Sequence, residues 1–270
     1  MKDEDLDPAA AAIFARLAGT YRAILDGFAG PDVRTALHWP LVVGRTPVAI
    51  PAFNRVMASD PAAVPPTTII DAALDELDDM PAYSWWLPPG PARALAPILA
   101  ARGFRDDDGP GEPAMWVDTA GLGALERPAG VEIDRVRSAE ESDVATATAV
   151  TGFELPHRFA GPMADMFRGA AARTASPIRM FLARLDGRPV ATSIGVLDGD
   201  MVGIYNVATV PEARGRGIGR AITLATLLDA RARGARIGLL ESSAMGRSVY
   251  RRLGFAEAGT FRVLIRMTGT

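Results

Sequence analysis

The sequence predicts an α+β protein with a mixed, mainly antiparallel sheet flanked by helices, an arrangement that we expect twice along the 270 residues. Residues 178–210 are typical of three antiparallel strands joined by two tight turns. A helix with one apolar face follows from Ile218, and a short apolar strand comes after it. The order helix, Gly-Phe, strand occurs around Phe104 and again around Phe255, so the two parts of the chain share a pattern.

A linker divides these parts near residue 125, where "GLGALERPAG" carries glycine, proline and charge without periodicity. We therefore expect two domains, 1–125 and 126–270. The elements predicted for the second domain are, in order, a strand over 131–137, helices over 138–150 and 156–171, strands over 178–185, 188–197 and 201–210, a helix from 218 to 233, a strand over 236–241, a helix over 242–253 and a strand over 260–267.

Local signals support these boundaries. Ser138 followed by Glu141 is a capping box, which predicts a helix start. Asp186-Gly187 is a two-residue hairpin signal between two strands. Gly234 follows the helical stripe as a C-cap, so the helix ends there, and the next strand is expected to run parallel to the strand before the helix.

Composition excludes several classes of function. The chain is 49% hydrophobic and 23% charged, as in soluble globular proteins, and its net charge of −3 disfavours general nucleic-acid binding. Without cysteine there are no disulfides, thiolate metal sites or cysteine nucleophile. His38 and His157 lie far apart, so no metal site is expected.

The start of the chain, "MKDEDLDPAAAA", is acidic where a secretion signal would be basic. No apolar run approaches the roughly 18 residues that a membrane span needs, so we expect a cytoplasmic protein without a membrane partner. Lys2 is the only lysine among 29 basic residues, and this bias towards arginine, with many Ala, Gly and Pro, indicates a bacterial genome rich in G and C.

Three glycines precede the helix that starts at Ile218: Gly215, Gly217 and Gly219. A helix N-terminus presents free N–H groups and a partial positive charge, so glycines there let a phosphate approach closely. A flexible capped loop is the alternative. No Gly-Lys-Ser/Thr follows, which excludes a Walker loop, and the preceding strand belongs to an antiparallel meander, which disfavours a dinucleotide fold.

The segment resembles the GNAT superfamily of acyl-CoA-dependent N-acetyltransferases, whose signature is Arg/Gln-x-x-Gly-x-Gly/Ala between a strand and a helix, with a later Tyr near Gly-Phe. Here "RGRGIG" spans 214–219 after the strand "NVATVP", and Tyr250 precedes Gly254-Phe255. The resemblance covers residues 131–267. Many members place an Asn seven residues before the Tyr, where this chain has Ser243.

The resemblance implies a GNAT-like fold that binds acetyl-CoA and transfers its acyl group to a primary amine by direct attack on the thioester. It implies that residues 215–220 wrap the pyrophosphate of coenzyme A, and that backbone groups at the end of the strand pair with the pantetheine arm and the thioester carbonyl. The cofactor contacts so implied are Val207, Ala208, Thr209, Arg214, Gly215, Arg216, Gly217, Ile218, Gly219, Arg220 and Ser243.

Proton transfer needs an acid and a base, because a lysine-like amine has a pKa of about 10.4 in water and must attack as the free base. By family position Tyr250 is the acid that protonates the leaving thiolate; the alternative is an aromatic side chain packed on the sheet. Glu241 is the first choice for the base, with a helix-capping role as the alternative. Glu154 and His157 are candidates for acceptor contacts, with an ordinary surface position as the alternative.

The first 125 residues are interpreted as a degenerate GNAT-like repeat without bound cofactor. Their elements at 47–58, 80–90 and 96–118 follow the order of the second domain, but no glycine motif occurs and Leu99 stands where Tyr250 would. An unrelated α+β domain is the alternative. The Phe-Asn-Arg and Ser-Trp-Trp segments are similar to those of bacterial tandem GNAT proteins, and Trp85 and Trp86 are expected in a core or interface.

Two other classes of function stay open: a non-catalytic acyl-CoA sensor, and a structural protein whose arginine-rich loop docks an acidic partner. The acceptor amine belongs to a small molecule or a peptide. The sequence does not identify it, because the residues that bind the acceptor lie in variable loops of this superfamily. The oligomeric state, monomer or homodimer, is open as well.

Overall fold

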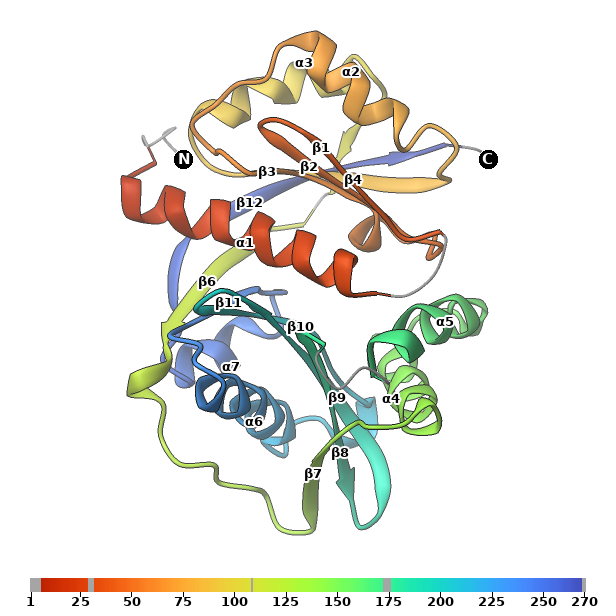
Figure 1. Cartoon of the computed structure of the whole chain (residues 1–270), viewed down its shortest axis with the longest axis vertical. Coiled ribbons are helices and arrows are strands. Elements are labelled where there is room, and N and C mark those ends of the chain that lie inside the picture. Colours follow the sequence, from red (N-terminus) through yellow and green to blue (C-terminus); the bar gives the residue numbers. More distant parts are fainter. Residues whose placement is uncertain (1–5, 29–31, 108, 172–175, 269–270) are drawn as a thin grey trace.

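The computed structural model describes residues 6–28, 32–107, 109–171 and 176–268. Its strands form one twelve-stranded sheet that runs through both parts of the chain (Figure 1). The order across the sheet is β1-β2-β3-β4-β12-β6-β11-β10-β9-β8-β7, and the short β5 pairs with β12. Most neighbours are antiparallel and helices flank the sheet, so the predicted fold class is confirmed.

The elements of the first part are α1 (Pro8–Gly27), β1 (Arg34–His38), β2 (Leu41–Arg45), the 3-10 turn η1 (Pro51–Phe53), β3 (Arg55–Ala58), α2 (Thr67–Asp75), β4 (Ala82–Leu87), η2 (Pro91–Leu95), α3 (Ala96–Ala100), β5 (Arg105–Asp106), β6 (Glu112–Asp118) and η3 (Thr119–Gly121). Those of the second part are β7 (Val131–Arg135), α4 (Ala139–Gly152), η4 (His157–Phe159), α5 (Ala160–Ala171), β8 (Ile178–Leu185), β9 (Arg188–Asp198), β10 (Met201–Thr209), η5 (Pro211–Ala213), α6 (Ile218–Ala232), β11 (Ile237–Glu241), α7 (Arg247–Arg252) and β12 (Ala256–Met267).

Local signals of the second part act as expected. The Ser138 hydroxyl accepts a hydrogen bond from the Glu141 N–H at 3.1 Å, which caps α4. Asp186 and Gly187 take positive φ angles in the hairpin between β8 and β9. Gly234, with φ of 101°, follows the C-terminal end of α6. β11 pairs parallel to β10, as predicted for strands joined by a helix.

The two parts exchange strands. β6, from the first part, lies between β11 and β12 and pairs antiparallel with both. β12 pairs with β6 over its first half, bends at a bulge near Gly259, and pairs with β4 from Arg262 onward. Gly259 has φ of 147°, and a Cβ there would lie 3.2 Å from the Phe14 ring, so the bend needs a glycine. The predicted boundary near residue 125 thus lies within a chain whose two parts share one sheet.

The prediction of a strand over 47–58 was only partly right. Pro51 begins a 3-10 turn, and the strand itself starts at Arg55. Proline fixes φ and has no N–H to donate, which favours a turn at this position. The turn changes the direction of the chain directly before Arg55, a residue of the site described below.

The long helix α1 covers the sheet where the two parts meet, between β3 and β12 above it and β10 and β11 below it in Figure 1. Its buried face, which includes Phe14, Leu17, Tyr21 and Leu25, belongs to a core that also contains apolar side chains from both parts. α1 therefore joins the two parts from one side, as the exchanged strands do within the sheet.

Candidate active site

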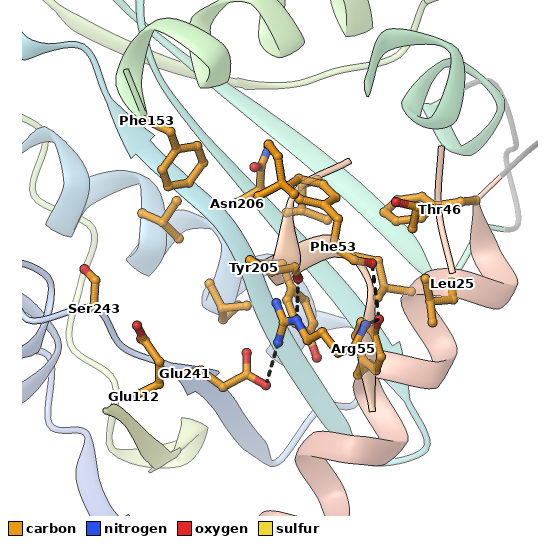
Figure 2. A pocket seen from close by; sticks show the side chains of 18 of the residues that line it. Leu25, Thr46, Phe53, Arg55, Glu112, Phe153, Tyr205, Asn206, Glu241 and Ser243 are labelled. Atoms are coloured by element: carbon orange, nitrogen blue, oxygen red, sulfur yellow. Dashed lines mark hydrogen bonds and ion pairs between the residues drawn. The ribbon is translucent and has the colours of Figure 1, made fainter. Parts of the chain in front are cut away.

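A gap in the sheet opens the candidate site. β10 and β11 pair only over Met201–Gly203 and Ile237–Leu239, and beyond these residues no pairing between the two strands occurs among the described residues. Asn206 lies at a bulge of β10 with φ of 53°, which turns the strand further. The separation leaves a cavity of about 380 Å³ between the strands, α1 and the first part of the chain (Figure 2).

Residues from both parts line this cavity. Those from residues 1–125 are Tyr21, Ile24, Leu25, Phe28, Thr46, Ile50, Ala52, Phe53, Arg55, Trp86 and Glu112. Those from residues 126–270 are Phe153, Leu155, Phe167, Ile194, Ile204, Tyr205, Asn206, Val207, Glu241, Ser243 and Tyr250.

Glu241, the last residue of β11, points into the cavity towards Arg55 (Figure 2). Its side chain is 6% exposed, and the closest oxygen lies 3.5 Å from Arg55 Nη1. Within the described residues neither of these two atoms has a hydrogen-bond partner. Burial raises the pKa of Glu241, and the neighbouring Arg55 charge opposes that rise. The pair therefore presents a buried donor and a buried acceptor to the cavity.

Arg55 is held by aromatic rings and by the backbone around it. Its guanidinium carbon lies 4.2 Å from the centre of the Trp86 ring and 5.0 Å from that of Tyr21. Its backbone N–H donates to the Tyr21 hydroxyl at 3.2 Å. The preceding Asn54 side chain accepts from the Thr46 N–H at 2.7 Å. The first part of the chain thus fixes an arginine that sequence analysis did not select.

The Phe-Asn-Arg and Ser-Trp-Trp segments lie next to each other and belong to the same network of contacts around Arg55. Ser84 donates from its hydroxyl to the Pro51 carbonyl at 2.7 Å and accepts from the Trp86 indole N–H at 2.9 Å. Trp85 lies in the core, as expected. Trp86 is also buried, but it borders the cavity and carries the Arg55 charge on its face.

Glu112 is the first residue of β6 and the second carboxylate of the cavity. Burial and the nearby Glu241 charge raise its pKa to about 7. Sequence analysis missed this residue, because "GEPAMWVD" marks only a strand start. Its place beside Glu241 follows from the strand exchange, in which β6 pairs with β11.

Tyr250 lies in α7 and borders the cavity. Its ring packs against Phe255 with centres 5.8 Å apart, and a Cβ at Gly246 would come within 2.7 Å of it. Burial raises the pKa of its hydroxyl to about 12. The ring is thus packed as an ordinary core aromatic would be, and it also borders the cavity.

Ser243 and the end of β10 form the neighbouring wall. The Ser243 hydroxyl accepts from the Gly246 N–H at 3.2 Å and Ser243 also borders the cavity. Val207 lines the cavity. Ala208 and Thr209 pair with β9, which lies on the side of β10 away from β11. In the described structure these β10 residues have no strand partner towards β11.

The glycine segment fits a phosphate group. Gly215 and Gly217 have φ of 76° and 79°, and a Cβ on Gly215 would meet nothing within 4 Å. A Cβ on Gly219 would lie 3.4 Å from the Thr209 hydroxyl. Among the described residues none accepts a hydrogen bond from the N–H groups of residues 218–220, which therefore stay free at the start of α6. These groups supply donors that an anion can use.

The arginines of this segment differ in their surroundings. Arg216 is exposed, and Arg220 lies 3.9 Å from Glu126. Arg214 turns back: its guanidinium donates to the Thr209 carbonyl at 3.1 Å and to the Gly152 carbonyl at 2.7 Å. In this structure Arg214 fastens the end of β10 to α4.

The two predicted acceptor contacts lie outside the cavity. Glu154 is 62% exposed and pairs with Arg214 at 2.7 Å. His157 is exposed at the start of η4. Neither lines the cavity, but their neighbours Phe153 and Leu155 do. The segment after α4 thus borders the site with apolar side chains. The sequence analysis looked for acidic and basic residues in this segment and therefore did not select them.

Comparisons with known proteins agree with this fold. Residues 122–240 match the family model described as an acetyltransferase (GNAT) domain. A GCN5-related N-acetyltransferase from Kribbella flavida shares 24% identity over 95% of this chain and 96% of its own, with a TM-score of 0.68. Another from Sphaerobacter thermophilus shares 16% identity over 85% and 81%, with a TM-score of 0.58.

A tandem GNAT protein from the clavulanic acid biosynthesis pathway covers 98% of this chain and 96% of its own, with 17% identity and a TM-score of 0.57. At such identities these likenesses show a shared fold. No curated protein matches the chain. Across the described residues, no helix has the length and apolar character that crossing a membrane requires.

Proposed function

We propose that this chain, whose residues 122–240 belong to the GNAT superfamily, is an acetyl-CoA-dependent N-acetyltransferase acting on a primary amine. The observation that carries the proposal is the cavity at the gap between β10 and β11. Tyr250, Ser243, Glu112 and Glu241 all line it, and the first two would face the cofactor. The groups that accept and supply protons thus border the same space.

The free N–H groups at the start of α6 would hold the pyrophosphate of the cofactor, with Arg216 and Arg220 adding positive charge. The β10 backbone from Val207 to Thr209, with Ser243 opposite, would hold its pantetheine arm. Arg214 would act indirectly by fixing the end of β10. When bound, acetyl-CoA supplies an acetyl group activated as a thioester.

Glu112 would take the proton of the acceptor. An amine with a pKa of about 10.4 is an ammonium ion at neutral pH and must lose a proton before it can react. A carboxylate whose pKa is about 7 is half ionised at that pH, which suits a general base. Glu241, paired with Arg55, would stay next to Glu112 and help to keep the pKa of Glu112 raised.

Tyr250 would donate from its hydroxyl to the leaving sulfur. With a pKa of about 12 the phenol keeps its proton at neutral pH, so it is a donor throughout the working range. A thiol has a pKa of about 8.5, well below that of the buried phenol, so Tyr250 would keep its proton and stabilise the leaving thiolate by a hydrogen bond.

Titration calorimetry with coenzyme A and an assay for free thiol over a panel of amines test the proposal. We expect binding, and thiol release that depends on an amine. Binding without release for any amine would instead favour the acyl-CoA sensor. Absence of binding would contradict both, and would leave the arginine-rich loop for another role.

A further inference from the structure

We infer that the acceptor is a small hydrophobic molecule with one amine and no other charge, and that the two parts of the chain together build the chamber that selects it. The inference rests on the proposed function and names the substrate class of the same site. It draws on three properties of the cavity: its walls, its charges and its size.

Most of the wall beyond the charged side chains is apolar, and its polar exceptions are Thr46, Asn206, Ser243 and the tyrosines. α1 contributes Tyr21, Ile24 and Leu25, whose spacing places them on one face of the helix, and Phe28 follows directly after its end. The remaining apolar walls come from both parts of the chain: Ile50, Ala52, Phe53, Phe153, Leu155, Phe167, Ile194 and Ile204. A bound molecule gains free energy here by removing apolar surface from water.

The charged side chains that line the cavity can be neutralised by one bound cation. Apart from tyrosines, the ionisable residues that line the cavity in the described structure are Arg55, Glu241 and Glu112. Arg55 balances Glu241, so ionised Glu112 leaves one negative charge, which one ammonium ion neutralises. A second ammonium or a carboxylate on the acceptor would lie among apolar side chains, where an unpaired charge is strongly disfavoured.

The size of the cavity suits an acceptor with a small body. A cavity of about 150 Å³ holds a benzene molecule, so 380 Å³ accommodates a ring or short alkyl chain together with the acyl end of the cofactor. The apolar walls include Phe167 and Ile194, which are buried in the core. A peptide would bring backbone amide groups to walls that offer them few partners, so a free small molecule fits better.

Matched pairs of amines test this inference on the full chain with acetyl-CoA. Hexylamine and 1,6-diaminohexane differ in a second ammonium group, and phenethylamine and phenylalanine differ in a carboxylate. We expect kcat/KM for each monoamine to exceed that of its charged partner on the order of 10²-fold. Equal or better use of the diamine, of phenylalanine or of a short lysine peptide would overturn the inference.

A charge placed in the apolar wall should alter the preference. Ile50 is half-buried in a loop that borders the cavity, so Ile50→Asp is expected to fold and to give a second ammonium group a partner. The ratio of kcat/KM for diamine over monoamine should rise at least about tenfold. The control, Val64→Asp, changes an exposed loop residue outside the cavity and should leave the ratio unchanged. An unchanged ratio in Ile50→Asp would also overturn the inference.

The same assays separate this inference from the function on which it rests. If coenzyme A binds but no amine releases thiol, the proposed function fails. If amines release thiol but the charged partners react as well as the monoamines, only the substrate class is wrong. Coenzyme A affinity measured by calorimetry on each variant shows whether the cofactor side has stayed intact.

Discussion

The two parts of the chain contain the same strand–helix–strand unit with different junctions. In the first part β3 leads through α2 to the parallel strand β4, and in the second β10 leads through α6 to the parallel strand β11. Before α6 stands Gly217 in a left-handed conformation, whereas Pro66 in an extended conformation stands before α2. Under the proposed function only the second of these units would provide a phosphate cradle, so the topology would not be sufficient for one.

The helix before the last Gly-Phe gives a second comparison. Gly103 and Gly254 both take positive φ, at 86° and 93°, so the chain turns alike after α3 and α7. Leu99 is fully buried in an apolar cluster, whereas Tyr250 borders the cavity. Under the proposed function the second part handles the cofactor, and the first part supplies Arg55, Glu112 and a share of the acceptor walls.

The largest test of this division changes Glu112, a residue of the first part. Glu112→Gln keeps the shape of the side chain but removes the group that accepts the proton, so we expect kcat/KM to fall about 10²- to 10⁴-fold. In the wild type kcat/KM should rise with pH through about 7 as Glu112 ionises, and the variant should lack that rise. Glu132→Gln, on the exposed side of β7, is the control. A variant with wild-type rate and pH profile would place the base elsewhere.

The next test concerns Tyr250. Tyr250→Phe keeps the ring against Phe255 and removes the donor, so kcat should fall on the order of 10²-fold with little change in acetyl-CoA affinity. Tyr83→Phe is the matched control, because Tyr83 is a buried tyrosine of the first part whose hydroxyl has no partner in the described structure. Wild-type turnover in Tyr250→Phe, with chemistry limiting, would make Tyr250 a core aromatic only.

A smaller effect is expected at the phosphate cradle. Gly217→Asp places a negative charge beside the free N–H groups of α6 and should weaken coenzyme A binding roughly tenfold, as measured by calorimetry. Gly217→Asn has the same size without the charge and separates repulsion from strain at positive φ. Thr67→Asp makes the same charge change at the start of α2 and should not alter binding. If each wild-type chain bound two coenzyme A molecules, the expectation that only the segment before α6 binds the cofactor would be wrong.

The smallest effect is on stability. The pKa of Glu112 is raised on folding from its usual value to about 7, so the protonated form is favoured in the native state. Its contribution is fully present below pH 4.5 and is lost as the pH rises through 7. Glu112→Gln should therefore raise the unfolding free energy at pH 8 by on the order of 1 kcal/mol, a shift of about 2 °C in Tm, with little change near pH 4. If the wild type and Glu112→Gln had the same melting curve at pH 8 as well as at pH 4, the raised pKa of Glu112 would be contradicted.

Sequence reasoning succeeded where the signal is local. The Ser138 cap, the Asp186-Gly187 hairpin and the glycine before α6 depend on a few neighbouring residues, and the structure confirms each as an element of the fold. Tyr250 was selected by family position and Glu241 by its place at the end of a strand, and both border the cavity. Their chemical roles stay predictions.

The other half of the site could not be predicted in this way. Glu112 meets Glu241 through pairing between strands more than 100 residues apart, and no local pattern encodes which strand lies beside which. Arg55 reaches the cavity because Pro51 turns the chain and two aromatic rings support its charge. Glu154 and His157 have suitable chemistry for an acceptor site, but the loop directs its apolar neighbours inward.

The exchange of β6 and β12 also bears on how the protein is made. β4 is buried along its whole length, and one of its edges is covered only by residues 262–267 of β12. During translation this apolar edge stays without its partner until residues 262–267 have been synthesised, which exposes a strand that can pair with other chains. Contacts of such long sequence separation also slow folding. Newly made chains are therefore prone to aggregate before β12 has paired with β4.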